Sequence, residues 1–236
     1  MNTSIIHDIP SEKEAFVSPA SFNQQSLWFL DRLEPNSAIY NIPISLRLCI
    51  PLKVEILEQS LNVVIQRHEV LRTTLIAVDG QPMQAIAAEL TVKLSLMDLR
   101  HLSEAEGEVE ALRLATEEAQ RPFNLAQGPL LREMLLQLGA EEYVLLLTIH
   151  HSIFDGSSTG ILLRELVALY EVLSSDQPLS LPELPIQYAD YAVWQREWLQ
   201  GEVLAEQLAY WKQQLASVPA VLELPTNRPR PAVPTY

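Results

Sequence analysis

An almost continuous apolar run from Tyr143 to His150 is the most constraining feature of the sequence. A strand with one face in water alternates apolar and polar residues, whereas a strand covered on both faces is apolar almost throughout. The run therefore predicts a central strand, paired with a second strand from Leu130 to Leu138. A turn at Asp155-Gly156 then leads into a predicted helix from Ile161 to Leu173. This order predicts a mixed sheet flanked by helices, in an α/β or α+β layered fold.

Periodicity predicts the remaining elements. Apolar residues at helical spacing predict helices, and a Ser103–Glu106 capping box opens one of them. Alternation predicts strands, and Asp79-Gly80 is a strong hairpin dipeptide. The predicted helices are Ser21–Leu33, Lys53–His68, Ser103–Gln120, Ile186–Leu199 and Ala205–Leu215, and the further predicted strands are Tyr40–Cys49, Val70–Val78 and Gln81–Ile86.

Composition excludes several classes of protein. Hydrophobic residues make up 48 % of the chain and charged residues 19 %, which is enough apolar material for a packed core. The net charge of −14 argues against binding a nucleic-acid backbone. The single cysteine, Cys49, allows no internal disulfide, the N-terminus has no signal-peptide pattern, and no apolar run is long enough to span a membrane. We therefore expect a cytoplasmic location. The acidic stretch Ser103–Gln120 is interpreted as a solvated helix face, with a docking surface for a basic partner as the alternative.

The segment His150-His151-Ser152-Ile153-Phe154-Asp155-Gly156 combines two histidines, a carboxylate and a glycine. A metal site is disfavoured, because adjacent residues on a strand point to opposite faces and cannot share one ion. Gly156-Ser157-Ser158-Thr159-Gly160 matches the nucleophile-elbow pattern of serine hydrolases, but no histidine follows it in the chain. Ser157 and Ser158 are therefore interpreted as residues at a helix N-terminus.

A third interpretation places one histidine at a strand end facing a cleft. Histidine suits proton transfer because its ordinary pKa is about 6.5. Asp155 would pair with an arginine to fix the loop, and Gly156 would permit a tight backbone. The alternative is that both imidazoles are structural residues of the core.

Three further segments join this one in a family pattern: Ser21–Leu30, Arg67–Thr74 and Tyr188–Gln195. Together the four resemble, in order, the motifs of the condensation domains of nonribosomal peptide synthetases. The resemblance implies a chloramphenicol acetyltransferase-like fold and a catalytic segment comprising His151, His150, Asp155 and Gly156. It also implies that Arg67 and Arg72 support the active-site cleft. We expect Trp28 and Phe29 to be core residues, and the aromatic stripe of Tyr188, Tyr191, Trp194 and Trp198 to serve packing.

The activity implied by the resemblance is amide formation between an aminoacyl or peptidyl thioester donor and an aminoacyl thioester acceptor. Both substrates would be held on the phosphopantetheine arms of upstream and downstream peptidyl carrier domains, with an adenylation domain in the same synthetase. The domain itself would bind no cofactor or metal. The Arg-Thr-Thr ending of the second motif resembles the subtype that joins L-configured donors to L-configured acceptors. The alternatives are a non-catalytic carrier-docking fragment and a free-standing coenzyme A-dependent acyltransferase.

The resemblance also sets an expected domain organisation. Residues 1–177 would form the N-terminal condensation lobe, and prolines at 178, 182 and 185 would mark a hinge. Residues 178–236 would be that hinge and the helical start of a second lobe, which is missing or incomplete. We therefore expect apolar side chains to be exposed where such a lobe would pack.

Overall fold

The computed structural model describes residues 15–175, 181–219, 225 and 228. The chain divides into two compact units, Met1–Arg196 and Glu197–Tyr236. The first unit extends beyond the expected boundary after residue 177, because the segment that ends at Arg196 bonds to its N-terminal part. The Phe22 N–H donates to Gln195 Oε1 at 3.0 Å, and the Arg196 guanidinium donates to the Ala20 carbonyl.

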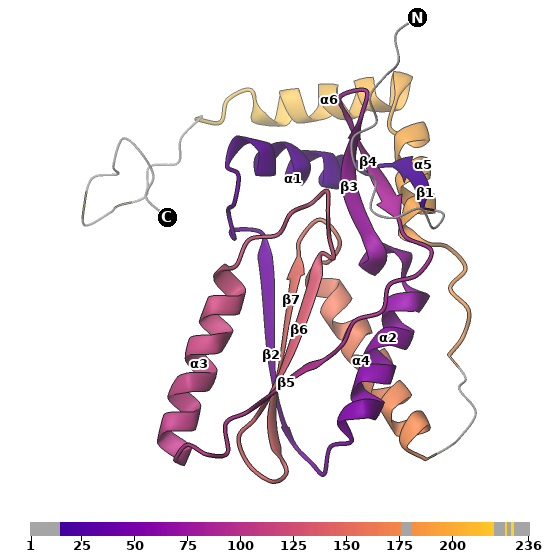
Figure 1. The fold of residues 1–236 in the computed structure, drawn as a ribbon. Coiled ribbons are helices and arrows are strands. Elements are labelled where there is room, and N and C mark those ends of the chain that lie inside the picture. The colour runs from indigo at the N-terminus through magenta and orange to yellow at the C-terminus, as the bar shows by residue number, and fades with distance from the viewer. Residues whose placement is uncertain (1–14, 176–180, 220–224, 226–227, 229–236) are drawn as a thin grey trace, which may run out of the picture. The chain divides into compact units, whose positions relative to one another are not determined.

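A four-stranded mixed sheet lies at the centre of the first unit (Figure 1). Its order is β2 (Asn41–Cys49), β7 (Glu142–His150), β6 (Leu131–Gln137) and β5 (Ser95–Asp98). Strands β2, β7 and β6 are antiparallel, and β5 runs parallel to β6. The apolar run is thus an interior strand, as predicted.

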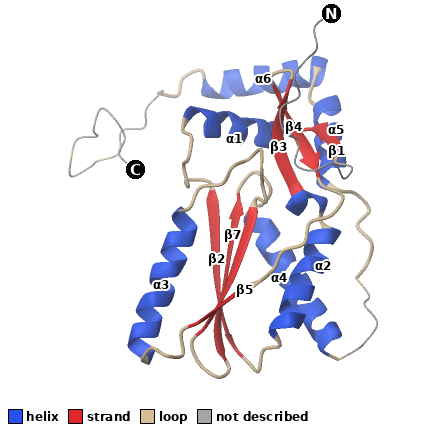
Figure 2. Ribbon diagram, in the orientation of Figure 1, coloured by secondary structure: helices blue, strands red, loops and turns tan. Residues whose placement is uncertain are grey.

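Helices cover both faces of this sheet (Figure 2). Helices α2 (Val54–Arg67) and α4 (Gly156–Ser174) pack on one face, and α3 (Glu104–Gln120) packs on the other. Alternate residues of β7 enter the two cores: Leu145 and Leu147 lie on the α2/α4 side, and Val144 and Leu146 on the α3 side. This explains why β7 lacks the alternation of a half-exposed strand.

A second, three-stranded antiparallel sheet has the order β1 (Phe16–Pro19), β4 (Gln81–Ile86), β3 (Thr73–Val78). Asp79 and Gly80 join β3 to β4 with φ angles of 50° and 77°. Both angles are positive, as a two-residue hairpin of this kind requires. A short 3₁₀ helix, η1 (Glu69–Arg72), precedes β3, so the strand predicted from Val70 begins only at Thr73.

The remaining helices that precede α6 (Gly201–Leu215) are α1 (Phe22–Leu33) and α5 (Tyr188–Trp198). Ser21 caps α1 in a reciprocal capping box with Gln24, and its hydroxyl also meets the Tyr188 hydroxyl at 2.9 Å. Trp28 packs against the core, but Phe29 is 57 % exposed, so its assignment to the core was wrong. The physical reason is that α1 packs against the core through one face, and Phe29 lies outside that face.

In the second unit, helix α6 (Gly201–Leu215) has exposed apolar side chains at helical spacing. They are Leu204, Leu208, Trp211 and Leu215. Apolar side chains are therefore exposed along one helix of this unit.

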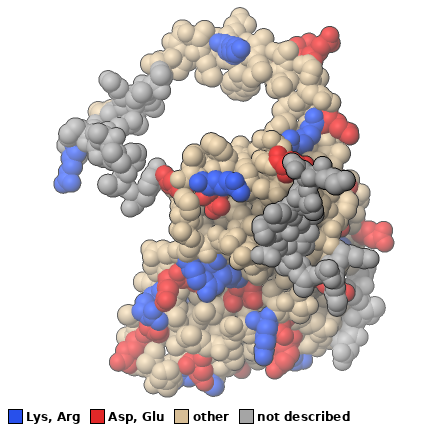
Figure 3. Space-filling view, turned by 45° about the horizontal axis from the view of Figure 1, so that its top comes forward, with Lys and Arg blue, Asp and Glu red and all other residues tan. Residues whose placement is uncertain are grey.

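Charged side chains of both signs are interspersed on the face seen in Figure 3, without one continuous acidic surface. On α3, Arg113 pairs with Glu110 and Glu117, and Glu108 pairs with Arg47 of β2. These exposed pairs agree with a solvated helix face. Within the described ranges, no helix is both long and apolar enough to cross a bilayer.

Candidate active site

The loop between β7 and α4 is anchored at both ends. The His151 N–H donates to the Tyr40 carbonyl at 2.8 Å, which extends the β2–β7 pairing past the end of β7. Ile153 and Phe154 are 4 % and 6 % exposed and fix the middle of the loop in the core. Asp155 then caps α4. Buried apolar side chains and a helix cap therefore hold the position of His151.

The two adjacent histidines occupy different environments. His150 is 3 % exposed, and the aromatic rings of Tyr40 and Phe123 lie edge-on to it. Its Nδ1 accepts the Ser152 N–H at 3.1 Å and lies 2.8 Å from the Ser152 hydroxyl. Because a backbone N–H can only donate, Nδ1 is unprotonated and the ring is neutral. Burial, and secondarily His151, lowers the pKa of His150 to about 4.

His151 is exposed and lines a cavity, and no residue that the structure describes forms a hydrogen bond with its ring. Of the two histidines, only His151 is available to a substrate. His150 instead has the structural environment that the alternative interpretation assigned to both.

Asp155 is the N-cap of α4. Its carboxylate accepts the Ser158 N–H at 2.8 Å and the Ser158 hydroxyl at 2.6 Å, and the Ser158 hydroxyl in turn accepts the Asp155 N–H. These bonds lower the pKa of Asp155. The sequence suggested an arginine partner, but Ser158 holds this carboxylate instead. The cap also explains why α4 begins at Gly156, before the predicted start at Ile161.

The tight backbone expected at Gly156 is not observed. A Cβ atom built on Gly156 would meet no atom within 4 Å, and its φ angle is not in the left-handed region. The described contacts therefore give no steric reason for glycine at this position.

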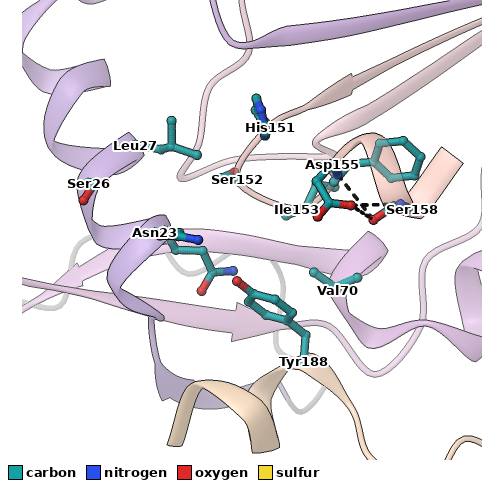
Figure 4. A pocket seen from close by; sticks show the side chains of 12 residues that line it. Asn23, Ser26, Leu27, Val70, His151, Ser152, Ile153, Asp155, Ser158 and Tyr188 are labelled. Carbon is teal, nitrogen blue, oxygen red and sulfur yellow. Dashed lines mark hydrogen bonds between the residues drawn. The ribbon is translucent and has the colours of Figure 1, made fainter. Parts of the chain in front are cut away.

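The cavity has a volume of about 360 Å³ and is formed by α1, η1, the β7–α4 loop and the first residues of α4 and α5 (Figure 4). His151, Asp155 and Tyr188 are its titratable groups, and burial raises the pKa of Tyr188. The remaining lining is apolar or uncharged: Asn23, Gln24, Ser26, Leu27, Val70, Ser152, Ile153, Phe154 and Ser158. An imidazole faces a mostly uncharged space, which suits proton transfer to or from a bound neutral group.

A family model described as "Condensation domain" matches residues 14–236. The chain belongs to the condensation-domain family. This agrees with the four motifs, and the expected fold class is also confirmed.

Curated and solved relatives of this condensation domain agree with the assignment. It is 54 % identical over 228 residues to a protein of the linear gramicidin synthase of Brevibacillus parabrevis, a match that covers 97 % of this chain and 4 % of that protein. It is 27 % identical to the X-domain from teicoplanin biosynthesis, with a TM-score of 0.80 over 96 % of this chain and 49 % of that one. The starter condensation domain of rhizomide synthetase RzmA shares the fold at 21 % identity, with a TM-score of 0.77 over 87 % of this chain and 49 % of that chain. The chain thus spans about half the length of these two solved structures.

Two arginines of this condensation domain were expected to support the cleft, and neither lines the cavity. Arg67 pairs with Glu165 of α4 at 3.2 Å and donates to the Pro182 carbonyl. Arg72 donates to the Ala87 carbonyl beside β4 and lies 3.6 Å from Glu69. Arg72 thus ends η1 and bonds beside the three-stranded sheet, whereas Arg67 ends α2 and joins it to α4 and to the segment before α5.

Other motif residues, not predicted from the sequence to be part of the site, also line the cavity. Asn23 and Leu27 come from the first motif, Val70 from the second and Tyr188 from the fourth. Tyr188 was expected to serve packing, yet its ring also forms a cavity wall. The sequence did contain a signal for these residues, because they belong to the same set of four motifs as His151. The four segments are far apart in the chain and gather around that one histidine.

Among the residues that the structure describes, no three His, Cys, Asp or Glu side chains gather in a metal-binding cluster.

Proposed function

We propose that this chain supplies the catalytic histidine of a condensation domain in a nonribosomal peptide synthetase. The observation that carries the proposal is His151, which is exposed to a mostly uncharged cavity and has no hydrogen bond to its ring from the described residues. The proposed substrates are an aminoacyl or peptidyl thioester donor and an aminoacyl thioester acceptor, and the similarity to the linear gramicidin synthase of Brevibacillus parabrevis supports a role in peptide synthesis.

In the proposed reaction, the acceptor's α-amine attacks the carbonyl carbon of the donor thioester. A C–N bond forms, the C–S bond breaks, and the donor's thiol leaves. The attacking nitrogen becomes positively charged and must lose one proton before the intermediate collapses to the amide. The leaving thiolate gains one proton, so charge and atoms balance.

His151 can act in either of two ways in this step. An α-amine has an ordinary pKa of about 7.7–8.0, so part of it is neutral near pH 7 and needs no deprotonation before attack. After attack, a histidine about 3 Å away can accept the nitrogen's proton, which is worth roughly 10²–10⁴ in rate. It can also hold the amine in line with the carbonyl, and poor positioning costs about 10².

The partners in this proposal are an upstream and a downstream peptidyl carrier domain, together with an adenylation domain of the same synthetase. The phosphopantetheine arms belong to the carriers, and this domain holds no cofactor of its own. We propose that the reaction joins an L-configured donor to an L-configured acceptor and takes place in the cytoplasm. The unpaired, exposed thiol of Cys49 is compatible with a reducing compartment.

The test uses the full-length protein that carries this chain, with aminoacyl-loaded donor and acceptor carriers, and measures the dipeptidyl product by mass spectrometry. We expect product from the wild type and a large loss of rate in His151→Ala. His101→Ala is the matched control, because His101 is an exposed histidine outside the cavity. Near wild-type turnover by His151→Ala would sink the proposal.

The same assay separates the two alternatives. Carrier binding without product in the wild type would identify a docking module. Product from a coenzyme A thioester and a free amine, without carriers, would identify a free-standing acyltransferase.

A further inference from the structure

Three ionisable side chains meet where the end of α2 packs against α4. Arg67 is the last residue of α2, His68 follows it, and Glu165 lies in the middle of α4. The Arg67 Nε lies 3.2 Å from one carboxylate oxygen of Glu165, and the His68 Nε2 lies 2.7 Å from the other. Their side chains are 16 %, 19 % and 14 % exposed, so this is not a solvated surface pair. Largely desolvated pairs of this kind depend strongly on both partners.

The cluster also holds the segment that leads into α5. The Arg67 guanidinium donates to the Pro182 carbonyl, and the Arg67 carbonyl accepts the Gln187 side-chain amide at 3.0 Å. The Gln187 side-chain oxygen accepts the Glu69 N–H at 3.2 Å. Gln187 therefore bonds to the chain on both sides of His68. The end of α2, the middle of α4 and the start of α5 are joined at this one point.

Each of these three elements leads directly to a wall of the cavity. Val70 follows His68 by two residues, Tyr188 follows Gln187 directly, and Asp155 and Ser158 stand at the start of the helix that carries Glu165. His151 faces the space between these walls. A rigid helix transmits a shift at Glu165 to its own N-terminus, and hence to the loop that carries His151.

We propose that Glu165 is a positioning residue for amide formation, acting through Arg67 and His68 to keep the three cavity walls in register around His151. This inference rests on the proposed function. Glu165 is not among the residues that line the cavity, so it acts on the geometry of the cavity walls rather than on the substrate directly. Misplacement of reacting groups by about 1 Å can cost about 10² in rate. Glu165→Gln keeps the size of the side chain and removes the charge that binds both partners.

The test is the single-turnover rate of dipeptide formation by the full-length protein. At a temperature where circular dichroism shows Glu165→Gln to be folded, we expect it to lower the rate by roughly 10- to 100-fold. Glu110→Gln is the matched control, because Glu110 also pairs with an arginine but on the exposed face of α3. A rate for Glu165→Gln equal to that of Glu110→Gln would overturn the inference.

A double-mutant cycle separates positioning from a merely structural role. If Glu165 acts by placing the cavity around His151, Glu165→Gln has little further effect once His151→Ala is present. Equal fold-losses in both backgrounds would contradict positioning.

The second arm of the cluster gives an independent check should Glu165→Gln fail to fold. His68→Ala removes one of the two partners and is expected to slow the reaction several-fold, whereas His68→Gln, which still donates an N–H, restores most of the rate. Equal rates for His68→Ala and the wild type would also overturn the inference. Absence of product from the wild type would instead refute the proposed function and, with it, the role of Glu165.

Discussion

His150 and His151 are adjacent in sequence but face opposite sides of the end of β7: the first is 3 % exposed and bonded to Ser152, and the second opens into the cavity. The arrangement follows from the alternation of side chains along a strand, which the His151 N–H bond to Tyr40 extends by one residue. One imidazole thus stabilises the loop that presents the other.

The first prediction concerns what His151 does chemically. We expect His151→Gln and His151→Ala to slow dipeptide formation equally, by about 10²–10⁴, because glutamine can form hydrogen bonds but cannot accept a proton from the ammonium intermediate near neutral pH. Single-turnover rates of the loaded full-length protein measure this. Substantial recovery of rate in His151→Gln would show that holding the amine in line is the main role.

The second prediction concerns Asp155 as a helix cap. Removing a side-chain N-cap costs about 0.5–2 kcal/mol, and asparagine caps about as well as aspartate. We therefore expect Asp155→Ala to lower the free energy of unfolding by about 1 kcal/mol and Asp155→Asn to leave it nearly unchanged, measured by urea unfolding. Equal losses in the two variants would mean that the negative charge, rather than the cap geometry, is what matters.

Sequence patterns predicted the elements whose signals are local. The apolar run of β7, the Asp79-Gly80 turn and the Ser103–Glu106 capping box all form as expected. Strand β5 was missed because its four residues are all exposed, so no alternation marks it. The start of α4 was only partly predicted: Ser157 and Ser158 lie at a helix N-terminus as expected, but the helix begins five residues before the predicted Ile161, because Asp155 caps it.

The site was only partly predictable for a related reason. The motif alone pointed to a histidine at a strand end, but not which of its neighbours would share the cavity. Asn23, Val70 and Tyr188 meet there only through the tertiary packing of α1, η1 and α5. The pairing of Arg67 with Glu165 likewise spans 98 residues and has no local signal.

The third prediction concerns the buried imidazole of His150. Burial lowers its pKa from 6.5 to about 4, so the folded state disfavours the charged form. The buried, neutral His150 contributes fully to the free energy of unfolding above about pH 6.5, and this contribution is lost as the pH falls through 4. The free energy of unfolding therefore falls by about 2 kcal/mol between pH 7 and pH 5. His150→Asn keeps an acceptor for the Ser152 N–H and removes the titration.

Loss of the ring makes His150→Asn less stable than the wild type at pH 7, and we expect this deficit to shrink toward pH 5 in urea unfolding. His101→Asn, at an exposed position, serves as the control. A deficit of constant size at both pH values would argue against a neutral, buried His150.

The fourth prediction concerns Glu133, whose pH dependence has the opposite sign. Glu133 lies on β6 opposite Leu147, and its Oε2 is buried without a hydrogen-bond partner among the described residues. Burial, helped by the negative charges of Glu118 and Glu58, raises the pKa of Glu133 from 4.5 to about 7. The folded state therefore binds a proton that the unfolded state has released. The contribution of protonated Glu133 to the free energy of unfolding is fully present below about pH 4.5 and is lost as the pH rises through 7.

Glu133→Gln removes this titration with almost no change in size. We expect it to raise the free energy of unfolding by about 1–2 kcal/mol at pH 8, after allowance for partial solvent access, and to have little effect at pH 5. Glu89→Gln, at an exposed position, is the control and should show no such difference. Urea unfolding at the two pH values measures both variants. A gain of equal size at pH 5 and pH 8 would show that the Glu133 carboxyl does not titrate in this range, because only an ionising group makes the gain depend on pH.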